Sequence, residues 1–291
     1  MSTDLIKQCL SRCCFPPPGT DYPIALSGGA DSTALVALAV HHGCVVSAHH
    51  VDHGLRPSSG DEARHAHRIA DALGVPITIY RAKLEPGPNL EARARDARQE
   101  LLPAGAATGH TADDQAETIL LRLLRGAGPT GLAAMEPGPR HPILRLRRAD
   151  TVAVCAALGI TPITDPSNDD PAMWRNRVRH ELLPLAADIA GRDLVPILAR
   201  TAELIRADSA ILDELATQID PTDARQLATA DPALARRALR RWLTEDGYPP
   251  DAASIDRVLD VAHGQAVACE LPGGRRVQRS SQRLHIAPGA R

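Results

Sequence analysis

The sequence is short of aromatic residues and of lysine. Aromatic residues make up 2% of its 291 positions, and Lys7 and Lys83 are its only lysines, so almost all of its positive charge is arginine. A hydrophobic content of 44% with 23% charged residues nevertheless excludes a globally disordered chain. The formal net charge of -2 excludes a protein coated in nucleic-acid-binding charge but is compatible with a local basic face.

Paired cysteines and long apolar runs are also lacking. The six cysteines, at positions 9, 13, 14, 44, 155 and 269, form no C-x-x-C pair and no zinc-ligand spacing, which is typical of thiols in a reducing compartment. No apolar run approaches the roughly 18 residues of a membrane-spanning helix, and no basic segment followed by an apolar one opens the chain. We therefore expect a cytoplasmic protein with no membrane partner.

A glycine pair between a strand and a helix is the most informative local feature. An apolar run over 23–26 leads into this loop and a helix-prone run over 33–40 follows it, so free backbone N–H groups and the positive end of a helix dipole meet there. Such a loop binds phosphate, and a carboxylate within it needs a divalent cation or a cationic substrate group beside it. The loop residues are Ser27, Gly28, Gly29, Ala30, Asp31 and Ser32.

Two better-known phosphate loops are excluded. The P-loop of kinases and GTPases requires a lysine directly after a glycine, and neither Lys7 nor Lys83 has that context. The Gly-x-Gly-x-x-Gly fingerprint of dinucleotide-binding folds is absent after this strand as well.

The order of apolar and amphipathic segments predicts two domains. Short strands over 44–51, 76–80 and 104–108 alternate with helices over 61–73, 90–102 and 112–125, which is typical of a parallel, doubly wound α/β sheet. Later segments predict helices through 197–212, over 231–247 and over 252–263, then a β-hairpin or meander over 267–286. We expect a catalytic domain over 1–184 and a mostly helical module over 185–291.

A second constellation follows the predicted strand that ends at Thr108. On a helix opening near Thr111, His110, Asp114 and Glu117 lie on one face, because their spacings are four and three residues. Two carboxylates with an imidazole suit an ammonium group, Mg2+ or general-base work. An acid-rich first helical turn, stabilised by the helix dipole, is the alternative interpretation. The neighbouring phosphate loop favours the functional one.

The segment around His50 suggests contact with a nucleotide. His50 and Asp52 face one side of a strand while His49 faces the other, which disfavours a closed zinc site.

Two arginine-containing segments have functional and structural interpretations. Arg95 and Arg98 suit a phosphate, although alternating charge also marks a solvated helix face. Arg175, Arg177 and Arg179 are closely spaced without an intervening acid and indicate a phosphate-rich partner, ATP or RNA.

Taken in order, these segments resemble the tRNA(Ile)-lysidine synthetases of the PP-loop ATP pyrophosphatase superfamily. The matching segments cover about the first 184 residues; they are 27–32, 50–56, 90–98, 109–118, 121–126 and 175–184. The resemblance implies an adenine-nucleotide alpha hydrolase-like domain. It also implies that ATP adenylates the C2 oxygen of the wobble cytidine in a tRNA(Ile) with a CAU anticodon, and that free L-lysine then replaces AMP at C2.

The resemblance implies roles for individual residues. Asp31 would position Mg2+ or assist the nucleophile, and Arg95 would neutralise charge on the leaving pyrophosphate. The phosphate loop, His50, Asp52 and Arg177 would bind ATP. The lysine substrate would be held by His110, Asp114 and Glu117. The tRNA-binding set would be Arg175, Arg179, Arg236, Arg237, Arg240 and Arg241.

One departure from the family concerns tRNA binding. Many members carry a further C-terminal domain for tRNA, whereas this sequence ends soon after Ile286, so the arginines of the helical module would have to grip the tRNA. A solvated arginine-rich face is the alternative. The sequence is compatible with a homodimer.

Two other functions compete with this one. A tRNA 2-thiolation enzyme that transfers sulfur through cysteines would need cysteine pairs, which are lacking. A catalytically silent nucleotide- or RNA-binding module would gain nothing from clustered carboxylates.

Overall fold

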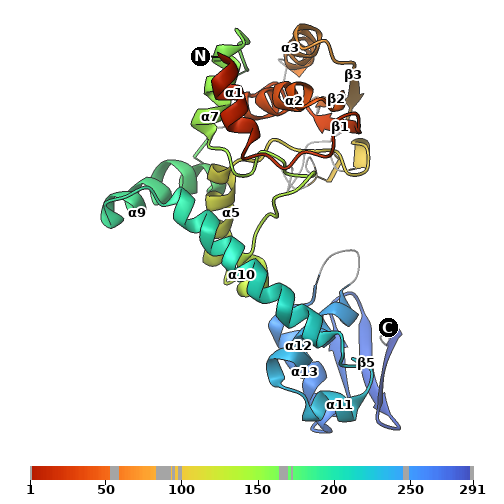
Figure 1. The fold of residues 1–291 in the computed structure, drawn as a ribbon. Helices are drawn as coiled ribbons and strands as arrows, with labels where there is room; N and C mark the ends of the chain where they lie inside the picture. The colour runs from red at the N-terminus through yellow and green to blue at the C-terminus, as the bar shows by residue number, and fades with distance from the viewer. Residues whose placement is uncertain are drawn as a thin grey trace. The chain divides into compact units, whose positions relative to one another are not determined.

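The computed structural model describes residues 2–52, 59–82, 93, 96–97, 100–163, 170–171, 173–244 and 249–288. The chain divides into two compact units, Met1–Glu203 and Leu204–Arg291 (Figure 1). The division falls within helix α10, Val195–Ala216, later in the chain than the predicted boundary after residue 184.

The first unit contains a parallel sheet, as predicted, and its strand order is β1-β2-β3. Its strands are β1 (Asp21–Ala25), β2 (Val45–Asp52) and β3 (Ile77–Arg81). Ile24 lies opposite Ala48, and His50 lies opposite Ile79, so the carboxyl ends of the strands share one edge. The strand predicted over 104–108 contributes only an isolated bridge from Ala107 to Ile24. The positive φ of Gly105, 77°, interrupts an extended conformation there.

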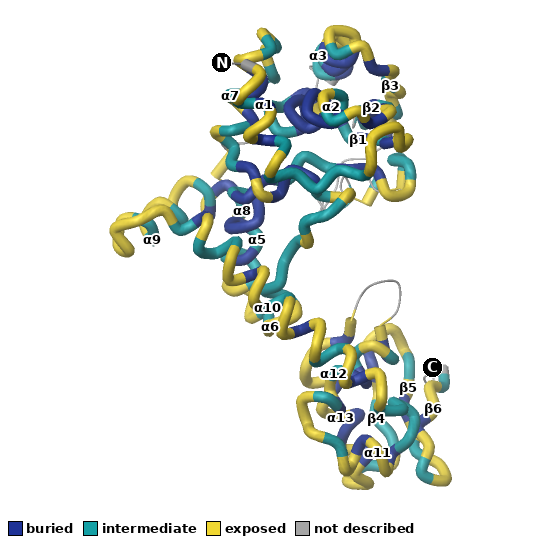
Figure 2. Tube along the Cα trace, viewed as in Figure 1, coloured by how far each residue is buried: buried dark blue, intermediate teal, exposed yellow. Residues whose placement is uncertain are grey.

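Helix α2 (Ala30–His42) is central to this unit. Its residues from Ser32 to Ala39 are all buried, as the dark blue tube in Figure 2 shows, because nearly every side chain in this run is apolar or small. It packs against β1 and β2, while α3 (Ser59–Ala72) packs against β2 and β3. The other helical segments are α1 (Ser2–Leu10), α5 (Ala112–Leu124), α6 (Pro129–Leu132), α7 (Arg148–Ala157), α8 (Trp174–Arg177), a π-helical turn (Val178–Leu182) and α9 (Leu183–Ala190).

The second unit is a helical module with a three-stranded antiparallel meander, which confirms the predicted fold class. It contains α11 (Ala224–Thr229), α12 (Pro232–Leu243), α13 (Ala252–His263), β4 (Ala268–Leu271), β5 (Arg275–Ser280) and β6 (Arg283–Pro288). Asp231 and Asp251 cap α12 and α13 by accepting backbone hydrogen bonds. Helix α12 ends at Leu243, before the predicted end at Gly247, which lies outside the described residues.

Across the described part of the chain, no helix combines the length and the apolar character needed to cross a membrane.

Candidate functional site

The glycine-rich loop joins β1 to α2 and is closed by its own serines. Gly28 has φ 90°, and a Cβ atom on it would lie 2.9 Å from Ile163 Cδ1. Gly29 is the N-cap of α2, and its carbonyl accepts a hydrogen bond from Ser32 Oγ at 3.1 Å. Ser32 Oγ also accepts one from the backbone N–H of Ser27 at 3.2 Å. The loop is therefore a fixed turn ahead of a helix N-terminus, as a phosphate site requires.

Gly109 brings a second segment against this loop. A Cβ atom at Gly109 would lie 2.8 Å from both the carbonyl carbon of Asp31 and the backbone nitrogen of Ser32. Only glycine permits so close an approach of two backbones. The segment that leads into α5 is thus held directly beside the first turn of α2.

His50 ties β2 to the base of the loop. Its side chain is buried, and its Nδ1–H donates to the Leu26 carbonyl at 2.8 Å, because a carbonyl can only accept. Asp52, the last residue of β2, is half-buried at the same edge of the sheet. His49 instead contacts Ser47 Oγ and the Tyr80 hydroxyl, each at 3.1 Å. The predicted alternation of this strand therefore separates His49 from His50.

Helix α5 carries the two carboxylates predicted to hold an amine. Thr111 is its N-cap, and Asp114 Oδ2 accepts hydrogen bonds from Thr111 N at 2.8 Å and Thr111 Oγ1 at 2.9 Å. The other oxygen of Asp114 faces a group of arginines. Glu117, one turn further along, is 1% exposed. A carboxylate so deeply buried requires cationic partners.

Two of these partners come from α8 and the π-helical turn. Arg175 donates from Nε to Glu117 Oε2 at 2.8 Å and from Nη2 to Asp114 Oδ1 at 3.0 Å. Arg179 binds both oxygens of Glu117, at 2.6 and 3.1 Å. π-Helical turns are frequent at functional sites. The structure therefore places Arg175 and Arg179, predicted to contact tRNA, against the carboxylates of α5.

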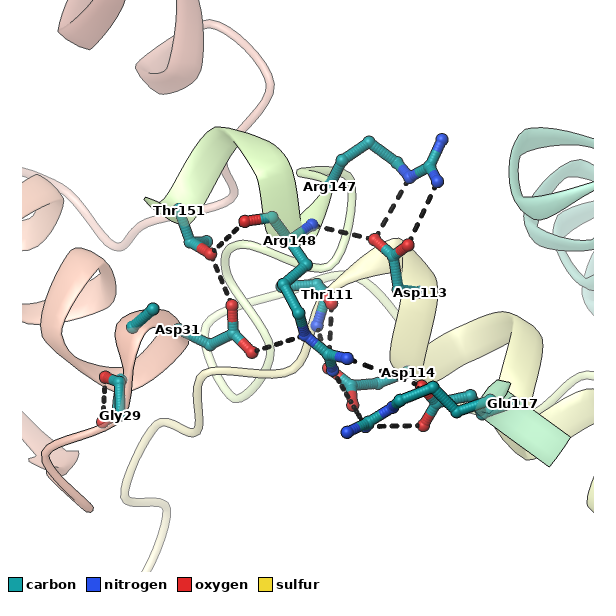
Figure 3. A network of polar contacts seen from close by, with 12 residues as sticks. Gly29, Asp31, Thr111, Asp113, Asp114, Glu117, Arg147, Arg148 and Thr151 are labelled. Carbon is teal, nitrogen blue, oxygen red and sulfur yellow. Dashed lines mark hydrogen bonds and ion pairs between the residues drawn. The ribbon is translucent and has the colours of Figure 1, made fainter. Parts of the chain in front are cut away.

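Arg148 is the third partner, and sequence reasoning missed it. Its Nη2 lies 3.2 Å from Asp114 Oδ1, its Nη1 lies 3.8 Å from Glu117 Oε1 and its Nε lies 3.4 Å from Asp31 Oδ2. Figure 3 shows its side chain between Asp31 and the α5 carboxylates. In the sequence, Arg147 and Arg148 stand as an arginine pair where α7 begins, which marks a cationic position but not its partners.

Asp113 anchors the backbone of Arg148. Its carboxylate accepts from Arg147 Nε and Nη2, both at 3.1 Å, and from the backbone N–H of Arg148 at 2.8 Å (Figure 3). The start of α7 is thereby bonded to the start of α5. The backbone of Arg148 is anchored while its side chain extends across the site.

The two aspartates have opposite pKa shifts. Burial raises the pKa of Asp31, and hydrogen bonds from Thr151 and Arg148 offset only part of that effect. Burial acts in the same direction on Asp114, but Arg175, Arg148 and the Thr111 N–H together hold its pKa below the ordinary value. Asp114 is therefore a firmly ionised group, whereas the described groups around Asp31 do not offset its burial.

His110 takes part in a separate polar cluster beside these groups. Thr108 Oγ1 lies 2.8 Å from His110 Nδ1 and 2.9 Å from His141 Nδ1. Burial and the neighbouring Arg140 lower the pKa of His141, so this ring is neutral near pH 7.

Arg177 forms its ion pair outside this constellation. Arg177, predicted to bind ATP, is exposed and pairs with Glu181 one turn along, at 2.9 Å. Arg95, predicted to be catalytic, and Arg98 lie outside the described residues.

The four arginines predicted to bind tRNA on α12 differ in their surroundings. Arg237 is mostly buried, with 14% of its side chain exposed, because it reaches Asp213 at 2.6 Å and the Ser209 carbonyl at 3.4 Å, both on α10. Arg236 is exposed and pairs with Asp256 at 2.9 Å. Arg240 is half-buried and Arg241 is exposed. The structure does not place all four on one solvent-facing surface.

Comparisons with known proteins identify relatives of this chain. The profile of a PP-loop domain matches residues 4–186, and that of a TilS substrate binding domain matches residues 223–285. The tRNA(Ile)-lysidine synthase of Nocardia farcinica is 43% identical over 292 residues, which cover 92% of each chain. The same enzyme of Salinispora tropica is 41% identical over 313 residues, covering 95% of this chain and 93% of the relative.

A solved structure shares the fold. The U34-tRNA thiolase of Methanococcus maripaludis aligns with 70% of this chain and 79% of its own, with a TM-score of 0.52 and 15% identity. The extent and identity of the sequence matches go further: this chain belongs to the tRNA(Ile)-lysidine synthase family.

Proposed function

We propose that this protein joins free L-lysine to C2 of the wobble cytidine of tRNA(Ile) with a CAU anticodon, and converts ATP to AMP and diphosphate. The observation that carries this proposal is the pair Asp114 and Glu117, buried one helical turn apart beside a phosphate loop. An enzyme that adenylates a base and then adds an amine needs an anion site and a cation site side by side. Membership in the lysidine synthase family supports the same reaction.

The phosphate loop serves the first step of the reaction, adenylation of the cytidine. Its backbone N–H groups and serine hydroxyls bind the ATP phosphates while the cytidine C2 oxygen attacks the α-phosphorus and diphosphate leaves. His50 holds the base of the loop through the Leu26 carbonyl. Arg95 neutralises charge on the leaving diphosphate, and Asp52 and Arg177 contribute to ATP binding, as the resemblance implies.

Asp31 fits a magnesium ion. Mg2+ typically binds one or two carboxylates together with substrate phosphates, and Asp31 is the carboxylate at this loop. Its surroundings provide too little positive charge to lower its pKa, which is the condition that a bound cation corrects. When bound, Mg2+ neutralises negative charge on the phosphates. Asp31 would be its protein ligand.

The α5 carboxylates serve the second half. Free lysine brings two ammonium groups, and Asp114 and Glu117 supply two anions within one helical turn. Three guanidinium groups now occupy these anions, so the position attracts cations in the folded protein. His110 lies next to the helix start and contributes a polar wall. The ε-ammonium group loses a proton, and the resulting neutral amine attacks C2 while AMP leaves.

The thiol chemistry counts against the 2-thiolation alternative. Burial raises the pKa of Cys13 to about 12 and that of Cys155 to about 11, and it also raises the pKa values of Cys9, Cys44 and Cys269. Sulfur transfer through a protein cysteine needs a thiolate, which forms more readily when the pKa is lowered. Clustered carboxylates likewise count against a catalytically silent RNA-binding module.

The helical module would bind tRNA. Arg236 and Arg241 are exposed and Arg240 is half-buried, so these three guanidinium groups can reach tRNA phosphates. The profile of a TilS substrate binding domain matches this region. Arg175 and Arg179 would meet tRNA only after release from the α5 carboxylates, and Arg237 only after release from α10. A cytoplasmic location and a homodimer complete the proposal.

The test is a single reaction. Purified protein is incubated with ATP, Mg2+, radiolabelled lysine and a CAU-anticodon tRNA(Ile) transcript beside an active control enzyme. We expect label on the tRNA, and none on a transcript whose wobble cytidine is replaced by uridine. Unlabelled CAU transcript beside an active control would refute the proposal.

A further inference from the structure

Arg148 is the one described side chain that contacts both Asp31 of the phosphate loop and the carboxylates of α5. A single guanidinium lies 3.4 Å from Asp31 Oδ2, 3.2 Å from Asp114 Oδ1 and 3.8 Å from Glu117 Oε1. The phosphate site and the cation site therefore share a positive charge (Figure 3).

Among the described residues, the charges of this cluster are balanced without substrates. Three carboxylates face three guanidinium groups, those of Arg148, Arg175 and Arg179. Lysine adds net positive charge at carboxylates that are already paired, whereas Mg2+ with ATP adds net negative charge beside Asp31. Lysine carries a net charge of about +1 and Mg2+ with ATP about -2, so each alone shifts the charge of the cluster and the two together offset each other in part.

We propose that Arg148 is a positioning residue that couples the two substrate sites, so that lysine and ATP each increase the affinity of the protein for the other. The proposal rests on the lysine site assigned above. When the lysine ammonium takes Asp114 and Glu117, the Arg148 guanidinium is displaced towards the phosphate loop and binds the ATP phosphates. When ATP binds first, its phosphates attract the same guanidinium and leave the α5 carboxylates to lysine.

The anchoring of Arg148 suits this exchange. Its backbone N–H is bonded to Asp113 at 2.8 Å, so the start of the side chain stays in place. The side chain itself is 31% exposed and therefore has room to change rotamer, whereas Glu117 is held almost fully buried at 1%. In this exchange the Arg148 guanidinium moves from the α5 carboxylates towards the phosphate loop, where it already contacts Asp31.

Calorimetric titration of the full chain with L-lysine tests the coupling. Lysine is titrated with and without Mg2+ and α,β-methylene-ATP, which cannot release diphosphate. We expect the analogue to tighten lysine binding at least about 5-fold, the low end of ordinary coupling between sites. By reciprocity, lysine tightens binding of the analogue by the same factor.

The Arg148→Met variant separates coupling from simple structural support. Removing the competing guanidinium should strengthen lysine binding in the absence of nucleotide and reduce the effect of the analogue to within about 2-fold of none, well below ordinary coupling. Arg148→Lys should restore part of the coupling. Arg145→Met, which removes an exposed partner of Glu203 nearby, should leave both constants and the coupling unchanged.

Three results would overturn the proposal. Equal lysine affinities with and without the analogue in the wild-type protein would refute coupling, while leaving the lysine site and the proposed reaction intact. Weaker lysine binding by Arg148→Met without nucleotide would show a structural role instead. Absence of lysine binding under every condition would refute the lysine site as well. The wild-type titration decides the question even if the methionine variant does not fold.

Discussion

Gly109 lies against the backbone of Asp31 so closely that a Cβ atom would stand 2.8 Å from the Asp31 carbonyl carbon. We therefore expect Gly109→Ala to force the two segments apart, at a cost of about 1–3 kcal/mol in unfolding free energy. Because the shifted backbone belongs to the phosphate loop, ATP affinity should fall as well. Gly138→Ala, where no atom lies within 4 Å of the added Cβ, is the matched control. Equal ATP affinities of the two variants would contradict this interpretation.

Glu117→Gln removes one charge from a buried group of ion pairs. Arg175 and Arg179 would lose their shared anion, and we expect a loss of about 3–5 kcal/mol in unfolding free energy, measured by urea denaturation. Lysine binding should disappear in parallel. Glu203→Gln, which breaks an exposed pair with Arg145, should change stability by no more than about 0.5 kcal/mol. Comparable losses in both variants would mean that the buried position of Glu117 has no energetic effect.

The lowered pKa of Asp114 predicts an acid limit to stability. A carboxyl whose pKa is lower in the folded than in the unfolded chain stabilises the fold fully above its unfolded pKa of about 4, and this contribution is lost as the pH falls through the folded value. Unfolding free energy measured from pH 7 down to pH 3 should therefore fall more steeply for wild type than for Asp114→Asn. Parallel curves would contradict the shift.

The pKa of Asp31 is shifted in the opposite direction from that of Asp114. Its pKa is raised by burial, so its ionised form weakens the fold as the pH rises through the raised folded pKa. Asp31→Asn should consequently be at least as stable as the wild type at pH 7, yet release no pyrophosphate from ATP in the presence of tRNA. Thermal denaturation and a pyrophosphate assay on the same sample check both halves. Pyrophosphate release at the wild-type rate would exclude a catalytic role.

Arg236 and Arg237 are adjacent in sequence but should behave differently. Arg237→Ala removes the bonds to Asp213 and Ser209 and should destabilise the second unit by about 1.5–3 kcal/mol. Arg236→Ala removes an exposed ion pair, so its stability should hold while tRNA affinity falls. The slope of log affinity against log salt should decrease by about 1 for each tRNA phosphate that the variant no longer neutralises. An unchanged salt slope for Arg236→Ala would favour a solvated face.

Local patterns account for what the sequence predicted well. The phosphate loop lies within six consecutive residues, and the face of α5 follows from a spacing of three and four, so neither needs knowledge of distant contacts. The parallel sheet and the late helices follow from periodicity in the same way. Membership in the family rested on several such segments in order.

Long-range partners account for what was missed. Arg148 lies 117 residues from Asp31, and nothing near it in sequence indicates that pairing. Arg175 and Arg179 belong to a basic run without an intervening acid, but their partner Glu117 lies about 60 residues earlier. An arginine-rich segment that binds a buried carboxylate cannot be distinguished by its sequence from one that binds a phosphate.

The charge balance around Glu117 also constrains how this site can change over time. A substitution that removes a single charge leaves an opposite charge buried and unpaired, which destabilises the fold. Simultaneous loss of one acid and one arginine keeps the net charge of the cluster unchanged. Glu117 and Arg179 form a bidentate ion pair and are the acid and arginine that could be lost together. Replacing these charged residues by neutral ones without a loss of stability therefore requires two substitutions together. Few mutational paths would lead such an enzyme to accept an uncharged amine donor.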